Sequence, residues 1–173
     1  TALHDLARAV RRARSERRPI AFNMPAEMLW QDTDYAPVSW AVPPLPSTRP
    51  EGAALDEAIG IIAAARRPVV LAGRGAISPA ARDALLQLAR RIEAPLATTM
   101  RARNLFAGEP HVLGVFGAVS TPQAAEAILS ADCVIAFGAG LNFHTTAQGS
   151  FLRGKRVIQV ADRAEDLGRG AVA

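Results

Sequence analysis

Apolar residues follow two alternating patterns along most of this chain. Short runs of consecutive apolar residues are typical of buried strands, and stripes that recur every three or four positions are typical of amphipathic helices. The stripes predict helices over 55–62, 81–92 and 124–129, and the runs predict strands over 69–72, 96–99, 133–137 and 157–160. The stretch between 100 and 120 reads as a long loop. This alternation predicts an α/β fold: a doubly wound parallel sheet with helices on both faces, Rossmann-like in kind.

The first fifty residues do not follow this alternation of helix and strand patterns. A helical stripe over 3–14 is followed by an expected short strand, 20–24, which Pro25 stops. One helix and one strand cannot bury both their faces, so residues 1–29 are interpreted as the C-terminal tail of an upstream domain. Residues 30–52 are rich in proline and predict an extended linker. Residues 53–173 then form the central α/β domain, which we expect to be cut before its last elements.

The segment 66–79 carries the strongest local signal. A buried strand leads into Gly73-Arg74-Gly75, and Ser78 followed by Pro79 is a typical helix start. A strand, a Gly-x-Gly turn and a helix N-terminus together are a potential cradle for a phosphate or another anion. Ligands of open parallel sheets bind beyond the carboxyl ends of the strands. The other expected strand ends are Thr98-Thr99-Met100, Gly138-Ala139-Gly140 and Ala161-Asp162-Arg163.

Several kinds of chemistry are disfavoured. The dinucleotide fingerprint requires a third glycine where Ser78 stands and an acidic residue about 20 positions further on, where the strand ends in threonines. His4, His111 and His144 have no metal-ligand spacing, so no metal site and no catalytic residue is predicted. Two roles are equally consistent with Asp162: it could accept a hydrogen bond from a ribose hydroxyl, or it could cap the turn that follows the last expected strand.

Charge, aromatic content and cysteine usage limit the binding partners and the cellular compartment that we expect for this chain. The net charge is +4, and the arginines between Arg8 and Arg18 alternate with Asp5, Glu16 and alanines, as on a solvated helix face. Aromatic residues are only 5% of the chain, so nucleic acid is not an expected partner. No apolar run approaches the roughly 18 residues needed to span a bilayer, so a membrane is not expected either. The single cysteine, Cys133, reads as a core residue in a reducing compartment, and we expect a cytoplasmic protein.

The order of segments resembles one family. The matching pieces are RRPVVLAGRGA, APLATTMRARNLFAGEP, LGVFG, ADCVIAFGAGLN and KRVIQVADRAEDLGR. They resemble the central domain of thiamine-diphosphate-dependent enzymes of the acetolactate synthase and benzoylformate decarboxylase group. The opening RRPIAFNMPAEM resembles the close of the pyrimidine-binding domain that precedes the central one. The resemblance covers nearly the whole chain.

The resemblance implies a three-domain 2-oxo acid decarboxylase or carboligase that forms a homodimer or homotetramer. The flanking pyrimidine- and diphosphate-binding domains would supply the glutamate that activates thiamine diphosphate and the Gly-Asp-Gly…Asn motif that holds Mg²⁺. Neither motif is in this chain, so the fragment alone is expected to be inactive, with a structural or nucleotide-holding role.

Some relatives hold FAD or ADP in this domain. The residues that match those positions are Gly73, Arg74, Gly75, Thr98, Thr99, Met100, Phe116, Gly117, Gly138 and Asp162. The chain lacks the arginine and the acids that FAD-binding synthases carry near 138–144, and this departure favours an empty groove. A free-standing FAD- or ADP-binding module of similar fold is the alternative interpretation.

Overall fold

The computed structural model describes residues 2–37, 41, 49–168 and 170. The chain divides into two compact units, Thr1–Thr48 and Arg49–Ala173. Each unit is considered by itself. No helix in the described part is both long and apolar enough to cross a membrane.

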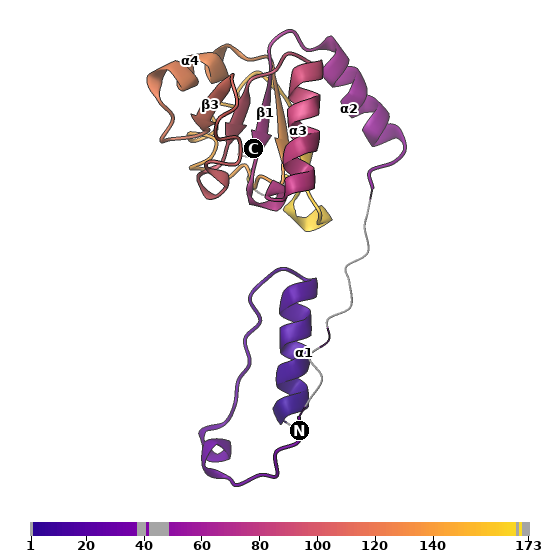
Figure 1. The fold of residues 1–173 in the computed structure, drawn as a ribbon, viewed down its shortest axis with the longest axis vertical. Coiled ribbons are helices and arrows are strands. Elements are labelled where there is room, and N and C mark those ends of the chain that lie inside the picture. The colour runs from indigo at the N-terminus through magenta and orange to yellow at the C-terminus, as the bar shows by residue number, and fades with distance from the viewer. Residues whose placement is uncertain (1, 38–40, 42–48, 169, 171–173) are drawn as a thin grey trace. The chain divides into compact units, whose positions relative to one another are not determined.

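The larger unit is built on a five-stranded sheet in which every neighbouring pair is parallel (Figure 1). The strand order is β3-β2-β1-β4-β5. The strands are β1 (Pro68–Ala72), β2 (Leu96–Thr98), β3 (Val112–Val115), β4 (Cys133–Phe137) and β5 (Arg156–Val160). The three central strands are almost wholly buried, as expected for a parallel sheet covered on both faces. The predicted fold class is confirmed.

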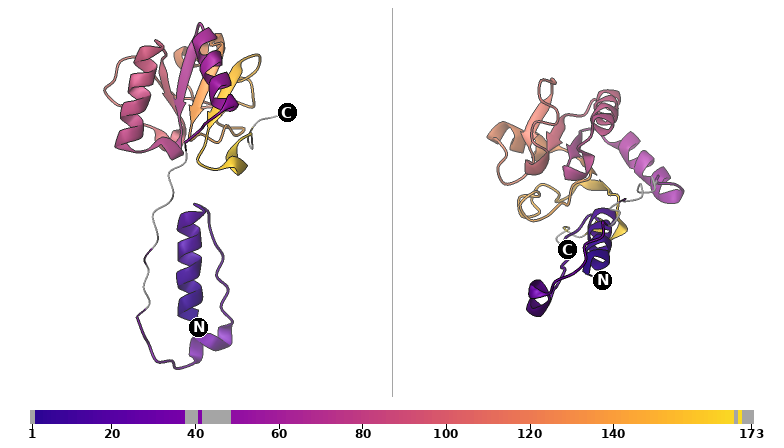
Figure 2. Two further views of the ribbon diagram at one scale, coloured as in Figure 1. Left: turned by 90° about the vertical axis from the view of Figure 1, so that its right-hand side faces the viewer. Right: turned by 60° about the horizontal axis from the view of Figure 1, so that its bottom comes forward.

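Helices cover both faces of this sheet (Figure 2). Successive residues of the same strand face opposite sides of the sheet, as Val70 and Leu71 of β1 do. Helices α2 (Ala53–Ala64) and α3 (Pro79–Arg91) contribute to the cluster on the Val70 side. Helix α4 (Pro122–Ser130) and the segment that follows β4 contribute to the cluster on the Leu71 side.

Helices α3 and α4 both begin at a side-chain cap, and the cap at Ser78 is the one predicted above. Ser78 Oγ accepts a hydrogen bond from Ala81 N at 3.1 Å, and Pro79 occupies the first turn of α3. Thr121 Oγ1 accepts one from Ala124 N at 3.2 Å at the start of α4. Proline costs nothing there, because the first turn of a helix has no intrahelical partner for its N–H.

Two sequence expectations about strands were wrong. The expected loop of 100–120 contains β3, which pairs with β2 through Leu96↔Val112, Ala97↔Gly114 and Thr98↔Val115, with a register shift between the first two pairs. This edge strand is short and only partly buried, and Gly114 interrupts it with a φ of +85°, so it has no continuous apolar run. Residues 20–24, which the structure describes, form no strand, and the described residues of their unit contain no other strand that could complete their hydrogen bonds.

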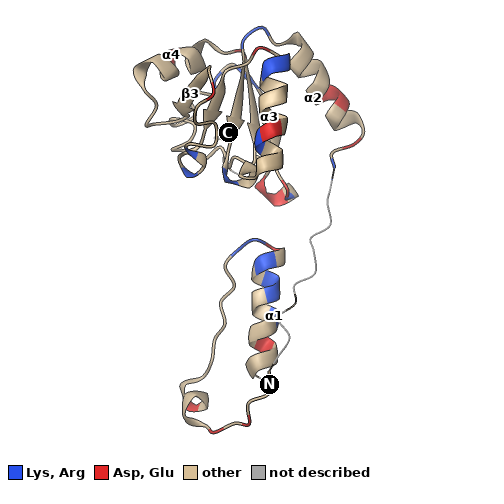
Figure 3. Ribbon diagram, in the orientation of Figure 1, with Lys and Arg blue, Asp and Glu red and all other residues tan. Residues whose placement is uncertain are grey.

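The smaller unit consists of α1 (Ala2–Ser15) and an extended segment with a 3-10 turn at Ala26–Trp30. Figure 3 shows basic residues towards the end of α1, where Arg12 pairs with Glu16 at 2.8 Å. Among the described residues of this unit, only Ala7 is fully buried, and Trp30 is 85% exposed. That this unit is the tail of an upstream domain stays a prediction. Within the predicted linker, residues 38–40 and 42–48 lie outside the described residues.

Candidate functional site

The carboxyl edge of the sheet brings the predicted site residues into one row. The strands are parallel, so all their carboxyl ends meet at that edge. Following the strand order, the row contains Phe116 and Gly117 after β3, Thr98 to Met100 at β2, Gly73 to Gly75 after β1, Gly138 after β4 and Asp162 after β5. The parallel topology alone therefore places these residues in one row. Whether they can bind a ligand depends on their side chains and backbone groups.

The centre of the row is a close contact between two glycine turns. Gly73 N donates to Phe137 O at 2.8 Å, and Gly75 N donates to Gly138 O at 3.0 Å. A Cβ added to Gly73 would lie 2.2 Å from Gly138 O, and one added to Gly138 would lie 2.5 Å from Gly75 Cα. Gly138 also has a φ of +60°, which favours glycine. The glycines let two backbone segments meet, and the space beside Gly73 is filled by the protein's own chain.

The backbone donors of the turn are also largely occupied. Ala76 N donates to Gly73 O at 3.0 Å, Ile77 N to Arg74 O at 3.3 Å and Ser78 N to Ala76 O at 3.0 Å. An anion-binding turn needs N–H groups that point at the ligand. Here the N–H groups of five of the six residues from 73 to 78 bind protein carbonyls, including those of Gly73 and Gly75.

The β2 end contributes little side-chain surface. Thr98 and Thr99 are buried, and Thr99 N donates to Ala72 O at 2.8 Å, which continues the pairing with β1. Thr98 Oγ1 reaches Gly114 O at 3.4 Å. Met100 is 48% exposed and therefore presents its side chain at the surface.

Phe116 and Gly117 serve packing. Phe116 is 1% exposed, and its ring meets that of Phe151 edge-to-face with centroids 5.3 Å apart. A Cβ on Gly117 would lie 2.6 Å from His144 O, and Ala118 N donates to the same oxygen at 3.0 Å. This pair of positions holds the segment after β4 against the end of β3.

Three side chains of the row are exposed. Arg74 and Asp162 are exposed, so the surface side chains from these positions are a cation, a carboxylate and the Met100 thioether. Near Asp162, the hydrogen bond from Arg163 to Glu165 raises the pKa of the arginine above its ordinary value. These exposed groups come from different strand ends, and no cluster of three or more His, Cys, Asp or Glu residues that would hold a metal ion occurs among the described residues.

Three polar residues missed by the sequence interpretation organise this edge. Ser120 Oγ bonds Val115 O, Gly117 O and Gly117 N, and Asn142 Oδ1 accepts from the N–H groups of His144 and Thr145 at 3.1 and 3.0 Å. Gln159 links Ala139 O, at 3.0 Å, to Gly168 N, at 2.8 Å. Serine and asparagine after a strand are signals for such turns. For Gln159, inside a strand, the sequence offers no local signal.

The opposite, amino edge carries two groups with shifted pKa values. Asp132 accepts hydrogen bonds from the backbone N–H groups of Arg66 and Arg67 at 2.8 and 2.9 Å, which hold the pKa of its carboxyl below the ordinary value. Burial raises the pKa of the Cys133 thiol, as for a packed residue. The hydrogen bonds of Asp132 join the start of β1 to the start of β4, so we assign this carboxylate a structural role.

Comparison with known protein sequences identifies the family of the larger unit. The model of the thiamine pyrophosphate enzyme central domain matches residues 55–173. Sulfoacetaldehyde acetyltransferase of Rhodobacter capsulatus is 30% identical over 168 residues, which are 94% of this chain and 28% of that protein. The acetolactate synthase large subunit of Parasynechococcus marenigrum is 29% identical over 161 residues, 90% of this chain and 26% of that protein. The chain thus spans little more than a quarter of these relatives, and through its α/β unit it belongs to the family of thiamine pyrophosphate enzyme central domains.

Proposed function

We propose that this chain is the non-catalytic central domain of a larger thiamine-diphosphate-dependent 2-oxo acid decarboxylase or carboligase of the acetolactate synthase type. Its role is structural: it holds its neighbouring domains in place and binds no nucleotide tightly. Thiamine diphosphate and Mg²⁺ belong to the flanking pyrimidine- and diphosphate-binding domains.

One observation carries the structural role. The Gly73–Gly75 turn stands where a phosphate cradle is expected, yet its amides donate to protein carbonyls, and the Gly138 backbone lies against it. A phosphate would have to displace those bonds, and an amide–carbonyl bond that is lost without replacement leaves a buried polar group at a cost of about 1–3 kcal/mol. The turn therefore stabilises the fold in its present state.

The relatives support the wider context. Their names describe an acetyltransferase that acts on sulfoacetaldehyde and a synthase of acetolactate, and the chain matches about a quarter of each. We expect the parent gene to encode the activating glutamate upstream and the Gly-Asp-Gly…Asn motif downstream. A gene that lacks both motifs would contradict the proposal.

The ligand test uses the 173-residue chain. Its melting temperature is measured with ADP, FAD, and thiamine diphosphate with Mg²⁺. A ligand at 100 times its Kd adds about 2.7 kcal/mol of stability, which is roughly 8 °C or more in Tm for a unit of this size. We expect no such shift with any of the three. A shift with thiamine diphosphate would refute the assignment of that cofactor to the other domains.

The activity test separates the domain from the enzyme. The chain, incubated with pyruvate, thiamine diphosphate and Mg²⁺, is expected to release no carbon dioxide above the protein-free control. The full-length enzyme under the same conditions serves as the positive control. Turnover by the chain alone would overturn its non-catalytic role.

A free-standing FAD- or ADP-binding module is the second candidate. The observation in its favour is the exposed surface beyond β1 and β2, where Arg74, Arg101 and Arg103 accompany the exposed Met100. Cations beside an apolar side chain suit a nucleotide's phosphates and base. A saturable Tm shift with ADP, lost in the Arg74→Gln variant, would establish this function in place of the structural one.

Assembly and location complete the proposal. The full-length protein is expected to form a homodimer or homotetramer, and light scattering of the full-length protein beside this chain tests it. We place the protein in the cytoplasm, because its single cysteine, Cys133, is buried and has no partner for an internal disulfide. Fractionation of the source cells tests that placement.

A further inference from the structure

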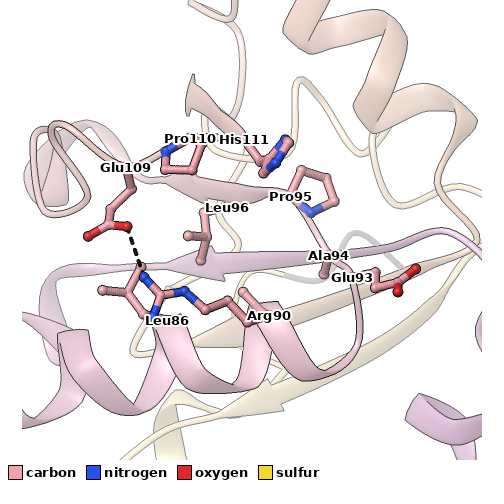
Figure 4. A pocket seen from close by; sticks show the side chains of 10 residues that line it. Leu86, Arg90, Glu93, Ala94, Pro95, Leu96, Glu109, Pro110 and His111 are labelled. Atoms are coloured by element: carbon pink, nitrogen blue, oxygen red, sulfur yellow. Dashed lines mark hydrogen bonds and ion pairs between the residues drawn. The ribbon is translucent and has the colours of Figure 1, made fainter.

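A pocket of about 480 Å³ opens at the amino edge of the sheet, at the opposite end from the row of glycine turns (Figure 4). It lies between the end of α3 and the starts of β2 and β3. Leu86, Ala89 and Leu96 are among its apolar lining residues. Its volume is within the range of small-molecule sites.

The charges around this pocket are unequally paired. Glu109 accepts from Arg82 at 2.8 Å and from Arg90 at 3.3 Å, so one carboxylate serves two guanidinium groups. Arg82 is also held by Leu105 O at 3.0 Å and lies 3.6 Å from a second carboxylate, that of Asp83. The Arg90 side chain is 71% exposed and makes the longer bond. Arg90 is therefore the looser partner, and a guanidinium has five N–H donors to offer.

The rest of the rim limits what Arg90 can receive. Glu93 also lines the pocket, and Figure 4 shows it on the far side from Glu109. A doubly charged anion would be repelled more strongly by the two carboxylates, whereas a single negative charge meets less repulsion and can accept from the N–H donors of Arg90 that Glu109 does not take. The apolar walls beneath suit an aliphatic body, which gains about 0.8 kcal/mol for each buried CH₂.

From these contacts we infer that the pocket binds a small aliphatic monocarboxylate, with its hydrocarbon body against Leu86, Ala89 and Leu96 and its carboxylate on Arg90. The site is separate from the carboxyl edge and does not depend on the function proposed above. No bond is made or broken there, so the site is for binding only.

The test uses hexanoate as the probe and the 173-residue chain. Amide chemical shifts are followed by ¹H–¹⁵N NMR, with hexanol as the uncharged probe of equal chain length. We expect saturable shifts centred on Ala94 and Leu96, with a Kd on the order of 1 mM, as befits a ligand of so few atoms. Hexanol should bind about threefold more weakly, and at most about fivefold, because an exposed ion pair contributes up to about 1 kcal/mol.

Three variants identify the groups responsible. Arg90→Gln should weaken hexanoate about three- to fivefold and leave hexanol unchanged. Arg91→Gln is the matched control: it removes a charge from the adjacent residue, which is also exposed but does not line the pocket, and it should change neither affinity by more than about 1.5-fold. Glu93→Gln should tighten hexanoate, because it removes a like charge from the rim.

Three results would overturn the inference. One is the absence of saturable shifts at hexanoate concentrations far above the expected Kd. Another is equal binding of hexanol and hexanoate together with no effect of Arg90→Gln, which would show an apolar cleft without carboxylate recognition. The third is a set of shifts centred on Gly73 and Thr99, which would place the ligand at the opposite edge.

Discussion

Replacing Gly73 with alanine tests whether the glycine turn is closed by the protein itself. The φ of Gly73 is −105°, which alanine adopts freely, so the whole effect must come from contacts of the new methyl group. That methyl group would lie 2.2 Å from Gly138 O and 2.5 Å from Ala139 Cα. Non-bonded atoms settle at about 3.5–4.0 Å, so the facing backbone must retreat by roughly 1 Å.

The cost follows from what holds that backbone in place. Gly138 accepts from Gly75 N at 3.0 Å and donates to Val160 O at 2.8 Å, and both bonds weaken if the segment moves. Overpacking costs about 1–3 kcal/mol, and each strained hydrogen bond adds about 1 kcal/mol. We therefore expect Gly73→Ala to lower the free energy of unfolding by about 3–5 kcal/mol, a large share of the 5–15 kcal/mol typical of a domain.

Urea denaturation of the chain, followed by circular dichroism, measures this loss as a lower midpoint at an unchanged slope. Gly140→Ala is the matched control, because that glycine lies two residues beyond Gly138, has nothing within 4 Å of an added Cβ, and has no positive φ. It should change stability by less than about 1 kcal/mol. If Gly73→Ala is as mild as Gly140→Ala, the turn is an open cradle, and our reason for assigning it a structural role fails.

Further predictions concern the contacts that join the elements. Asp132→Asn keeps one acceptor for the N–H groups of Arg66 and Arg67 and should cost about 1 kcal/mol. These bonds lower the pKa of the Asp132 carboxyl below its ordinary value of 3.8. The wild type should therefore exceed the variant in free energy of unfolding by the full amount above pH 3.8, and by less as the pH falls through the folded-state pKa. A difference that increases towards acid pH in urea titrations would contradict this. Lys155→Met removes two 2.7 Å bonds to carbonyls at the end of α4 and should lower the free energy of unfolding in urea by about 1–2 kcal/mol, with Lys155→Arg the milder control. Ser78→Ala removes the cap of α3 and should cost about 1 kcal/mol, seen as a lower Tm, whereas Ser78→Asp should retain stability.

Local patterns were sufficient for most of the secondary structure. The apolar runs of β1, β4 and β5 and the stripes of α3 and α4 predicted each element to within a few residues, because fully buried strands and amphipathic helices have distinct periods. The caps at Ser78 and Thr121 were equally local, since a capping side chain and its N–H partner are three residues apart.

Edge elements were harder to predict for a physical reason. β3 exists because β2 offers it hydrogen bonds, and Gly114 deprives it of the continuous apolar run that marks a buried strand. The residues 20–24 show the reverse case: their apolar run favours a strand, and they form none where the described part of their unit offers no strand to pair with.

The sequence by itself determined the alternation of helix and strand, the parallel sheet and the row of strand ends where a ligand site was expected. Only the tertiary structure decided the state of that site, because the groups that fill it come from distant parts of the chain. Gly73 meets Gly138 across 65 positions of sequence, and their backbone hydrogen bonds occupy the donors that a phosphate would need. The same holds for the pocket at the other edge, where Arg90 of α3 meets Glu109 of the loop that precedes β3. A pattern along the chain shows which residues are available, and the contacts between distant segments decide which of them remain free to bind.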